Sequence, residues 1–261
     1  MTWTPKPSYR LAENTISRED ISSLASWLTD GDPWLTQGPH VKEFEELFAE
    51  KVGAKHALFV NSGSSANLLA WFLPIAIDRE QVAENRRVVL PAVSWATSVM
   101  PAIQFGYEPV LCEADEKTWG LDPKDLRRIC EKAPPSIVLL VHVLGVPCPM
   151  KEIEDLRKEF GFLLIEDSCA AFGSSPIGRF GEISTYSTYF AHQFSTIEGG
   201  FVTTKGDSSE GDNVLRMLRS HGWAVDCDTA TRERLAKAWK TDPFREKFTF
   251  YAPGFNVRGT D

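Results

Sequence analysis

The sequence predicts an α/β fold, a three-layer sandwich in which helices cover both faces of a mainly parallel sheet. Short apolar runs alternate with amphipathic helical patterns through residues 57–166. The runs are continuous rather than alternately polar, which is typical of strands buried on both faces. Polar side chains follow several runs, and ligands of open parallel sheets bind at that carboxyl edge.

The composition fits a globular protein and excludes several classes of function. The chain has 261 residues, of which 43% are hydrophobic and 25% charged, and a net charge of −8. A negative chain of this kind is not expected to bind nucleic acid or an anionic membrane surface. Its five cysteines are widely spaced without a CxxC pair, which favours a reduced, cytoplasmic protein without a zinc motif. The N-terminus has no apolar signal region, and the longest apolar run is too short to span a bilayer.

The elements follow in order from the N-terminus. Residues 1–16 read as an extended arm, and Ser17 with Asp20 forms the pattern of a capping box in front of a helix. Further helices are expected at 40–52, from Leu68 onward, and at 96–105, 122–132 and 150–160. Strands are expected at 57–60, 88–91, 109–112, 137–143, 162–165, 184–190 and 201–204.

A small polar turn, Asn61 to Asn67, joins the first strand to the helix expected from Leu68. Glycine lets the backbone approach a ligand, serine hydroxyls donate, and a helix N-terminus presents free N–H groups to an anion. The same serines also fit a plain helix cap. The turn alone does not decide between these two interpretations.

Two further residues stand at strand ends. Trp95 follows the strand at 88–91, where it either faces a ligand or packs in the core. Asp167 ends the run from Phe162, and a buried acid there needs a partner. It either caps the following turn or pairs with a cationic ring nitrogen of a ligand.

The stretch Ser184 to Gly200 places a single reactive side chain between two strands. We expect the first strand to run to Phe190, so that His192 is held at its end and faces a pocket. A polar turn then closes on Glu198-Gly199-Gly200 before the next strand. What His192 does depends on the groups that the other strand ends bring to it.

Taken together, these motifs resemble the sugar aminotransferases of fold type I, the DegT/DnrJ/EryC1/StrS family, which use pyridoxal phosphate on nucleotide-linked keto sugars. The resemblance covers nearly the whole chain. Its landmarks are Trp34 to Pro39, Ser62 to Asn67, Glu166-Asp167, Ser187 to Gly200, and Gly254 to Arg258.

The resemblance implies a role for each matching residue. Gly63 and Ser64 would hold the cofactor phosphate with help from Ser187, and Trp95 would stack on the pyridine ring. Asp167 would keep the ring nitrogen protonated, since a pyridinium withdraws electrons far better than a neutral ring. Asn256 would reach the phosphate of a neighbouring subunit, because these enzymes are homodimers with shared active sites.

His192 departs from the aminotransferase pattern, which has a lysine at this position, six residues before the acidic residue of the glycine pair. An imidazole cannot form the covalent link that lysine makes with the cofactor, and Lys205 at the far end of the next strand is a poor substitute. Histidine here resembles the dehydratase branch of the family, in which it removes a proton from pyridoxamine phosphate joined to a 4-keto-6-deoxy sugar.

Two subtypes of this branch differ in their cofactors. One carries an iron–sulfur cluster, which needs several close cysteines, but only Cys227 follows His192. No cluster or other metal is therefore expected. The stretches from Leu218 to Trp223 and from Asp242 resemble the cluster-free subtype, which acts on GDP-4-keto-6-deoxymannose and takes its amine from glutamate. Ala170 is a departure, since aminotransferases often have glutamine or histidine there.

The resemblance also implies the domain organisation. Residues 1–30 would be an arm and helix, 31–250 the cofactor-binding large domain, and 251–261 the start of a C-terminal small domain that is expected to be missing. The predicted function is a 3-dehydratase of deoxysugar and lipopolysaccharide biosynthesis. An aminotransferase that uses another amine and a non-catalytic relative of the family remain as alternatives.

Overall fold

A sheet with strand order β1-β7-β6-β5-β4-β2-β3 forms the middle of the computed structural model, which describes residues 14–31, 33–174, 177–206 and 209–261. Its strands are β1 (His56–Val60), β2 (Arg87–Pro91), β3 (Glu108–Cys112), β4 (Ile137–Val141), β5 (Leu163–Asp167), β6 (Ile183–Ser187) and β7 (Gly200–Thr204). The pairs β2–β3, β2–β4, β4–β5 and β5–β6 are parallel. Only β7 runs the other way, antiparallel to both β1 and β6. The prediction of a mainly parallel sheet is thus confirmed.

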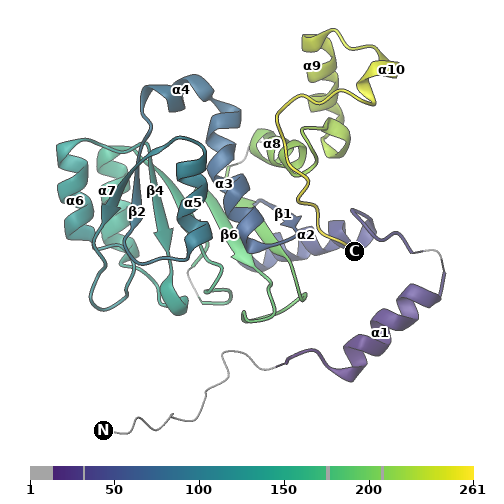
Figure 1. Cartoon of the computed structure of the whole chain (residues 1–261), viewed down its shortest axis with the longest axis horizontal. Helices are drawn as coiled ribbons and strands as arrows, with labels where there is room; N and C mark the ends of the chain where they lie inside the picture. Colours follow the sequence, from purple (N-terminus) through teal and green to yellow (C-terminus); the bar gives the residue numbers. More distant parts are fainter. Residues whose placement is uncertain (1–13, 32, 175–176, 207–208) are drawn as a thin grey trace, which may run out of the picture.

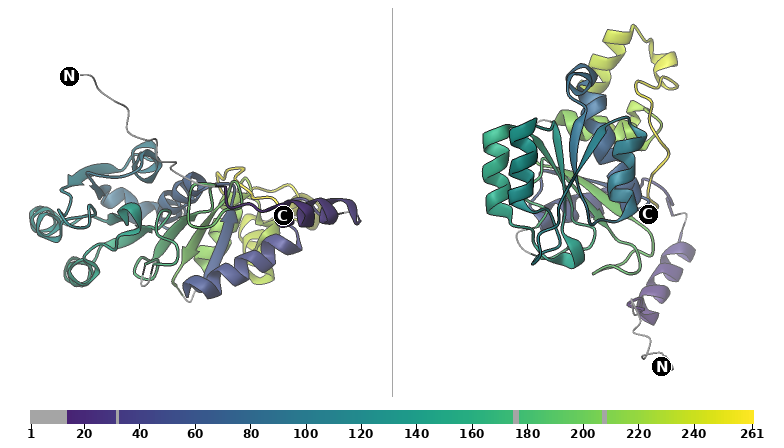
Figure 2. Two further views of the ribbon diagram at one scale, coloured as in Figure 1. Left: turned by 90° about the horizontal axis from the view of Figure 1, so that it is seen from below. Right: turned by 60° about the vertical axis from the view of Figure 1, so that its left-hand side comes forward.

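Helices cover both faces of the sheet, as Figures 1 and 2 show. One face packs against α3 (Gly63–Ile77), α5 (Ala96–Gln104) and α8 (Ser209–Arg219). The other packs against α6 (Pro123–Lys132) and α7 (Met150–Phe160), and, nearer β1, against α2 (Pro39–Val52). The remaining helices are α1 (Arg18–Thr29), α4 (Arg79–Glu84), α9 (Thr229–Trp239) and α10 (Pro243–Glu246), with 3-10 turns at Val143–Gly145 and Ala224–Asp226.

Strand β4 shows why an unbroken apolar run is needed at the centre of this sheet. Ile137, Leu139 and Val141 pack in the cluster with α3 and α5. Val138 and Leu140 point to the opposite face and pack with α6 and α7. Successive side chains of a strand alternate between faces, so a strand covered on both sides must be apolar at every position.

Three predicted boundaries are wrong. The strand predicted at 184–190 ends at Ser187, because the ladder with β7 loosens there and residues 188–199 form a loop. The strand predicted at 137–143 ends at Val141, where a 3-10 turn follows. The helix expected from Leu68 begins at Gly63, because the hydroxyl of Ser62 caps its first turn.

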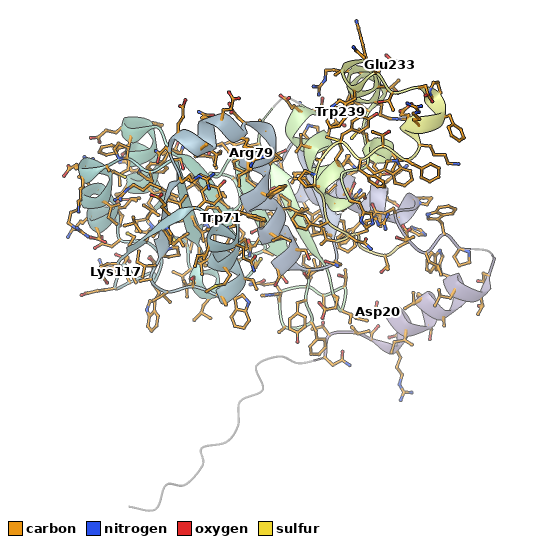
Figure 3. All side chains as sticks on the ribbon, turned by 45° about the horizontal axis from the view of Figure 1, so that its top comes forward. Asp20, Trp71, Arg79, Lys117, Glu233 and Trp239 are labelled. Atoms are coloured by element: carbon orange, nitrogen blue, oxygen red, sulfur yellow. The ribbon has the colours of Figure 1, made fainter. Side chains whose placement is uncertain are left out.

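The first helix has the predicted capping box, in which Ser17 and Asp20 bond to each other's backbone N–H groups. It lies away from the sheet in both views of Figure 2, and its apolar side chains Ile21, Leu24 and Leu28 are exposed. The predicted arm before it falls mostly outside the described residues. In Figure 3, Asp20 on α1 and Trp239 on α9 lie far from Trp71. Trp71 belongs to α3, and its side chain is fully buried. Among the described helices, none is long and apolar enough to cross a membrane.

Candidate active site

The predicted site residues gather along one edge of the sheet. Gly63 follows β1 and Trp95 follows β2, while Asp167 ends β5 and Ser187 ends β6. These four strands run in the same direction, so their carboxyl ends meet at the same edge. The antiparallel strand β7 starts at this edge, where Gly200 pairs with both Val60 and Ser187.

The polar turn after β1 is both a helix cap and a possible anion cradle. The Ser62 hydroxyl accepts a hydrogen bond of 3.1 Å from the backbone N–H of Ser65. Within the described ranges, the N–H groups of Gly63 and Ser64 have no protein acceptor, as is usual for the first turn of a helix. A Cβ at Gly63 would lie only 2.6 Å from the Cβ of Ser187. Glycine is therefore needed for the close approach of α3 to β6, and the two free donors point to a ligand-binding role.

Trp95 precedes α5 and is 73% exposed, so the alternative that it packs in the core is wrong. The start of α5 lies beside the start of α3, because the Ser64 hydroxyl donates to the Thr97 hydroxyl at 3.1 Å. The exposed indole thus stands at the same edge as the free N–H groups of α3. An exposed aromatic ring in this place can cover a planar ligand.

Asp167 is 4% exposed, and three donors converge on its carboxylate. Oδ2 accepts hydrogen bonds from the Asn67 amide at 3.0 Å and from the Ser98 hydroxyl at 2.6 Å. Oδ1 accepts one from the backbone N–H of Cys169 at 3.0 Å, which is the turn-capping bond that the sequence allowed. Oδ1 has room for one more donor, so capping of the turn does not exclude a ligand.

His192 lies in the loop between β6 and β7, not at a strand end. Its backbone N–H donates to the carbonyl of Tyr189 at 2.9 Å, and its ring is half-buried. The next residue, Gln193, reaches the turn after Asp167, because its amide donates to the carbonyl of Ala170 at 2.5 Å. Burial lowers the pKa of His192, while the charge of Asp167 partly opposes this shift. The contact of Gln193 thus holds the loop with His192 against the turn after Asp167, and the lowered pKa keeps the imidazole in the unprotonated form that can accept a proton.

Lys205 cannot take the place of the absent lysine. It follows Thr204, which pairs with Ile183 at the far end of the β6–β7 ladder. Its backbone N–H donates to the carbonyl of Glu182, just before β6 begins. The whole length of β7 thus separates Lys205 from the edge that carries Asp167.

Asn256 stands apart from the other predicted site residues. Its side chain is exposed and accepts a hydrogen bond of 3.2 Å from Arg258. Its segment runs beside the end of β1, where the carbonyl of Val257 accepts a hydrogen bond from Asn61 at 3.0 Å. The structure thus brings Gly63, Ser64, Trp95, Asp167, Ser187 and His192 to one edge and leaves Asn256 facing outward.

A buried pair on the opposite face supports the strand ends. His142 and Glu166 are both fully buried, and Nε2 of His142 lies 2.8 Å from Oε1 of Glu166. Nδ1 accepts the backbone N–H of Cys148 at 3.3 Å, so Nε2 carries the proton that is donated to Glu166. Glu166 also accepts hydrogen bonds from the backbone N–H groups of Gly178, Phe180 and Gly181. Burial alone would raise the pKa of Glu166, but these hydrogen bonds and His142 outweigh it and lower the pKa.

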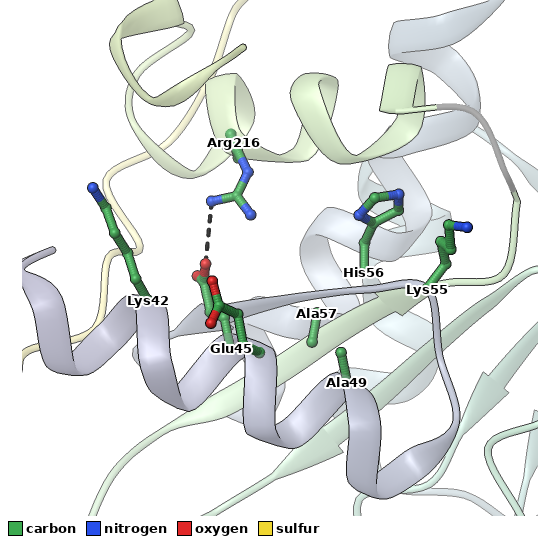
Figure 4. A pocket seen from close by; sticks show the side chains of 8 residues that line it. Lys42, Glu45, Ala49, Lys55, His56, Ala57 and Arg216 are labelled. Carbon is green, nitrogen blue, oxygen red and sulfur yellow. Dashed lines mark hydrogen bonds and ion pairs between the residues drawn. The ribbon is translucent and has the colours of Figure 1, made fainter.

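Two cavities lie elsewhere, on the flank formed by α2 and α8. Their volumes are about 250 and 210 Å³. Figure 4 shows the larger one, into which Lys42, Glu45, His56 and Arg216 project. Arg216 is already paired there with Glu45 at 3.1 Å and with Asp212 at 2.8 Å. Neither cavity contains a predicted site residue, and internal ion pairs account for the arginine in them.

Sequence reasoning missed four residues that build the site, namely Asn67, Ser98, Thr185 and Gln193. The first three are at most 2% exposed and form one hydrogen-bonded group with Asp167. An asparagine inside the apolar helix that follows Gly63 was the signal that could have found this group. Nothing in the sequence indicates the contact of Gln193 with Ala170.

Comparisons with known proteins agree with this arrangement. The profile of the DegT/DnrJ/EryC1/StrS aminotransferase family matches residues 15–261. The GDP-4-keto-6-deoxy-D-mannose 3-dehydratase of Escherichia coli O55:H7 is 31% identical over 255 residues, which are 96% of this chain and 64% of that protein. The chain thus spans a little less than two thirds of the length of this relative.

Solved structures share the fold. The crystal structure of a GDP-4-keto-6-deoxymannose-3-dehydratase histidine-to-asparagine mutant with bound GDP-perosamine has a TM-score of 0.84 at 29% identity, covering 97% of this chain and 65% of that one. Another structure of such a dehydratase, with a trapped PLP–glutamate geminal diamine, has a TM-score of 0.79 at 29% identity, covering 97% and 65%. These similarities confirm the predicted fold class.

Proposed function

Because the chain belongs to the DegT/DnrJ/EryC1/StrS aminotransferase family, we propose that it is a pyridoxamine-phosphate-dependent 3-dehydratase of a nucleotide-linked 4-keto-6-deoxyhexose. The observation that supports this proposal is His192, at the sequence position of the aminotransferase lysine, in a loop that Gln193 joins to the turn after Asp167. Lys205, at the other edge, offers no replacement. The similarity to GDP-4-keto-6-deoxymannose 3-dehydratases favours the GDP-linked sugar as the substrate.

The residues at this edge fit pyridoxal or pyridoxamine phosphate. The close contact of Gly63 with Ser187, which a Cβ would block, leaves backbone donors of α3 for the phosphate. Ser64 and Ser187 add hydroxyl groups beside these donors, and the exposed indole of Trp95 would cover the ring. The remaining lone pair of Asp167 would receive the ring N–H. The bound cofactor supplies an amine for the sugar ketone and a ring that withdraws electrons.

The protein's own residues then direct the chemistry. Asp167 would face the ring nitrogen with a carboxylate that three hydrogen-bond donors hold in place. His192 accepts a proton at its imidazole, whose lowered pKa keeps it neutral near pH 7. Because an imidazole cannot form the covalent link that a lysine makes, the cofactor would stay untethered. No lysine amine would then compete with the sugar for the cofactor.

The direct test incubates the chain with pyridoxal phosphate, glutamate and GDP-4-keto-6-deoxymannose. A dehydratase removes the C3 hydroxyl, which NMR detects as new methylene protons at C3. A stable 4-amino sugar would instead show an aminotransferase. A second incubation supplies pyridoxamine phosphate and omits glutamate. Product formed in this incubation would show that glutamate acts as the amino donor and is not needed for the dehydration itself.

We also propose that the protein is a homodimer in which Asn256 serves the partner's site. The outward direction of Asn256 supports this, because its side chain contacts only Arg258 within the described part of the chain. Light scattering gives the oligomeric state. A mixture of His192→Asn and Asn256→Ala chains should regain activity, since one site of each mixed dimer then has both native residues. No regain in proven mixed dimers would place Asn256 outside the partner's site.

A further inference from the structure

Four buried polar side chains form a continuous hydrogen-bonded group on the sheet face covered by α3 and α5. The Thr185 hydroxyl donates to Asn67 Oδ1 at 2.7 Å, and Asn67 Nδ2 donates to Asp167 Oδ2 at 3.0 Å. The Ser98 hydroxyl donates to the same Oδ2 at 2.6 Å. Each of the four residues is at most 4% exposed. These hydrogen bonds are therefore shielded from bulk water.

The direction of these bonds is fixed by chemistry. A carbonyl oxygen can only accept, so the Thr185 hydroxyl must donate to Asn67 Oδ1. The other end of the Asn67 amide then presents its N–H group to Asp167. A flipped amide would place an oxygen against the carboxylate, which is repulsive in a buried setting. Thr185 thus orients Asn67 so that the amide N–H of Asn67 faces Asp167.

The two oxygens of Asp167 are consequently not equivalent. Among the described residues, Oδ2 accepts hydrogen bonds from Asn67 and Ser98, whereas Oδ1 accepts the backbone N–H of Cys169, whose thiol also interacts with this carboxylate. We propose that Asn67 and Ser98 are positioning residues that occupy Oδ2, so that Oδ1 is the oxygen presented to the ring nitrogen of the cofactor. This inference rests on the proposed function, since it assigns the atom of Asp167 through which the cofactor is bound.

Occupying Oδ2 fixes the orientation that a ligand meets. The carboxylate cannot rotate without breaking the hydrogen bonds from Asn67 and Ser98 to Oδ2. A ring N–H that arrives at Oδ1 would therefore meet an acceptor that is held in place.

The experiment measures cofactor binding rather than turnover. Pyridoxamine phosphate is titrated into the whole chain while its fluorescence is followed, and the absorbance of the bound cofactor is recorded against pH. We expect Asn67→Leu to bind pyridoxamine phosphate roughly tenfold more weakly, which corresponds to about 1.4 kcal/mol. The ring nitrogen should also lose its proton at a lower pH in this variant, and Ser98→Ala should show both effects.

A second Asn–Asp pair, in which only the asparagine is buried, provides a control. Asn213 on α8 is 3% exposed, and its amide donates at 2.6 Å to the exposed Asp228, away from the sheet edge. Asn213→Leu should lower the stability but leave the affinity and the absorbance of bound pyridoxamine phosphate unchanged. Ser98→Thr, which keeps the hydroxyl, should bind the cofactor as the native chain does.

The outcomes separate this inference from the proposed function. If the native chain binds no pyridoxamine phosphate, the proposed function fails and the inference with it. If the native chain binds it and both Asn67→Leu and Ser98→Ala keep the same affinity and titration, only the positioning role is overturned. Should Asn67→Leu not fold, Ser98→Ala and Thr185→Val decide alone, with a smaller effect expected for Thr185→Val because Asn67 stays in place.

Discussion

The side-chain amide of Gln193 donates a hydrogen bond of 2.5 Å to the backbone carbonyl of Ala170. This bond joins the loop that carries His192 to the turn that follows Asp167. Ala170 stands where aminotransferases often have glutamine or histidine, but its side chain takes no part in this contact. Its backbone carbonyl binds Gln193, which is next to the proposed base His192.

Replacing Gln193 should therefore slow the reaction more than it weakens substrate binding. An exposed hydrogen bond of this kind contributes about 0.5–1.5 kcal/mol, so we expect Gln193→Ala to lower kcat roughly two- to tenfold with little change in KM. Steady-state kinetics give both values. Gln193→Glu, which keeps the length but loses the donor, should behave like Gln193→Ala, and native-like kinetics of both would show that the bond has no role in the reaction.

His192 is predicted to be the base of the dehydration. His192→Asn removes the base and should lower kcat about 100- to 10,000-fold. His192→Lys should abolish dehydration and add an absorption band of a covalent lysine–cofactor link. A spectrum of His192→Lys with pyridoxal phosphate that equals the spectrum of the free cofactor would contradict the placement of His192 next to the cofactor.

The pH dependence follows from the lowered pKa of His192, for which burial is the first cause. Its base form persists below the ordinary histidine pKa of 6.5, so kcat/KM should stay high down to pH 6.5 and fall only as the pH drops through the folded pKa. The same shift means that the unfolded chain binds the proton more readily. The associated stability is thus complete above pH 6.5 and lost at lower pH. A fall of kcat/KM that already begins near pH 8 would contradict this assignment.

Glu166 is expected to be essential for stability. Glu166→Gln puts an amide NH2 in place of one carboxylate oxygen, facing either the N–H of Gly178 or those of Phe180 and Gly181, and should lower the free energy of unfolding by about 3–5 kcal/mol. Urea unfolding measures the loss. Because its pKa is lowered on folding, Glu166 stabilises the protein above its unfolded pKa, and this contribution disappears as the pH falls through the folded value.

The surface acid Glu159 offers a control, because its side chain is 49% exposed and pairs with Arg127 at 2.8 Å. Glu159→Gln should change the free energy of unfolding by about 1 kcal/mol or less. Equal losses in Glu166→Gln and Glu159→Gln would show that burial of the Glu166 hydrogen bonds does not increase their contribution to stability.

Gly63→Ala should weaken cofactor binding. The new Cβ would lie 2.6 Å from the Cβ of Ser187, so α3 and β6 must move apart at the proposed phosphate site. We expect the Kd for pyridoxal phosphate to rise at least roughly tenfold, measured by absorbance titration. Gly211→Ala on α8, where the nearest atom lies 3.9 Å away, should bind the cofactor normally and be slightly more stable.

The sequence predicted the layers of the fold because each central strand must be apolar on both faces. It also predicted which residues would share the sheet edge, since strand ends can be read from the turn residues that follow them. It did not predict where β6 ends, because the aromatic and β-branched run Thr188 to Phe190 has strand propensity and still hydrogen-bonds to residues 196–199, although the regular pairing with β7 stops at Ser187 and Gly200. The sequence also did not predict the hydrogen-bonded group around Asp167, because Asn67, Ser98 and Thr185 lie in three segments that are far apart in the sequence.

The antiparallel direction of β7 determines where the loop that carries His192 lies. A right-handed parallel crossover after β6 would carry the chain to the opposite edge, whereas the hairpin keeps residues 188–199 above the strand ends. The reactive side chain therefore sits on a connection whose two anchors, Ser187 and Gly200, are already paired. Exchanging the residue at position 192 can thus alter the chemistry of this edge while every register in the sheet is kept.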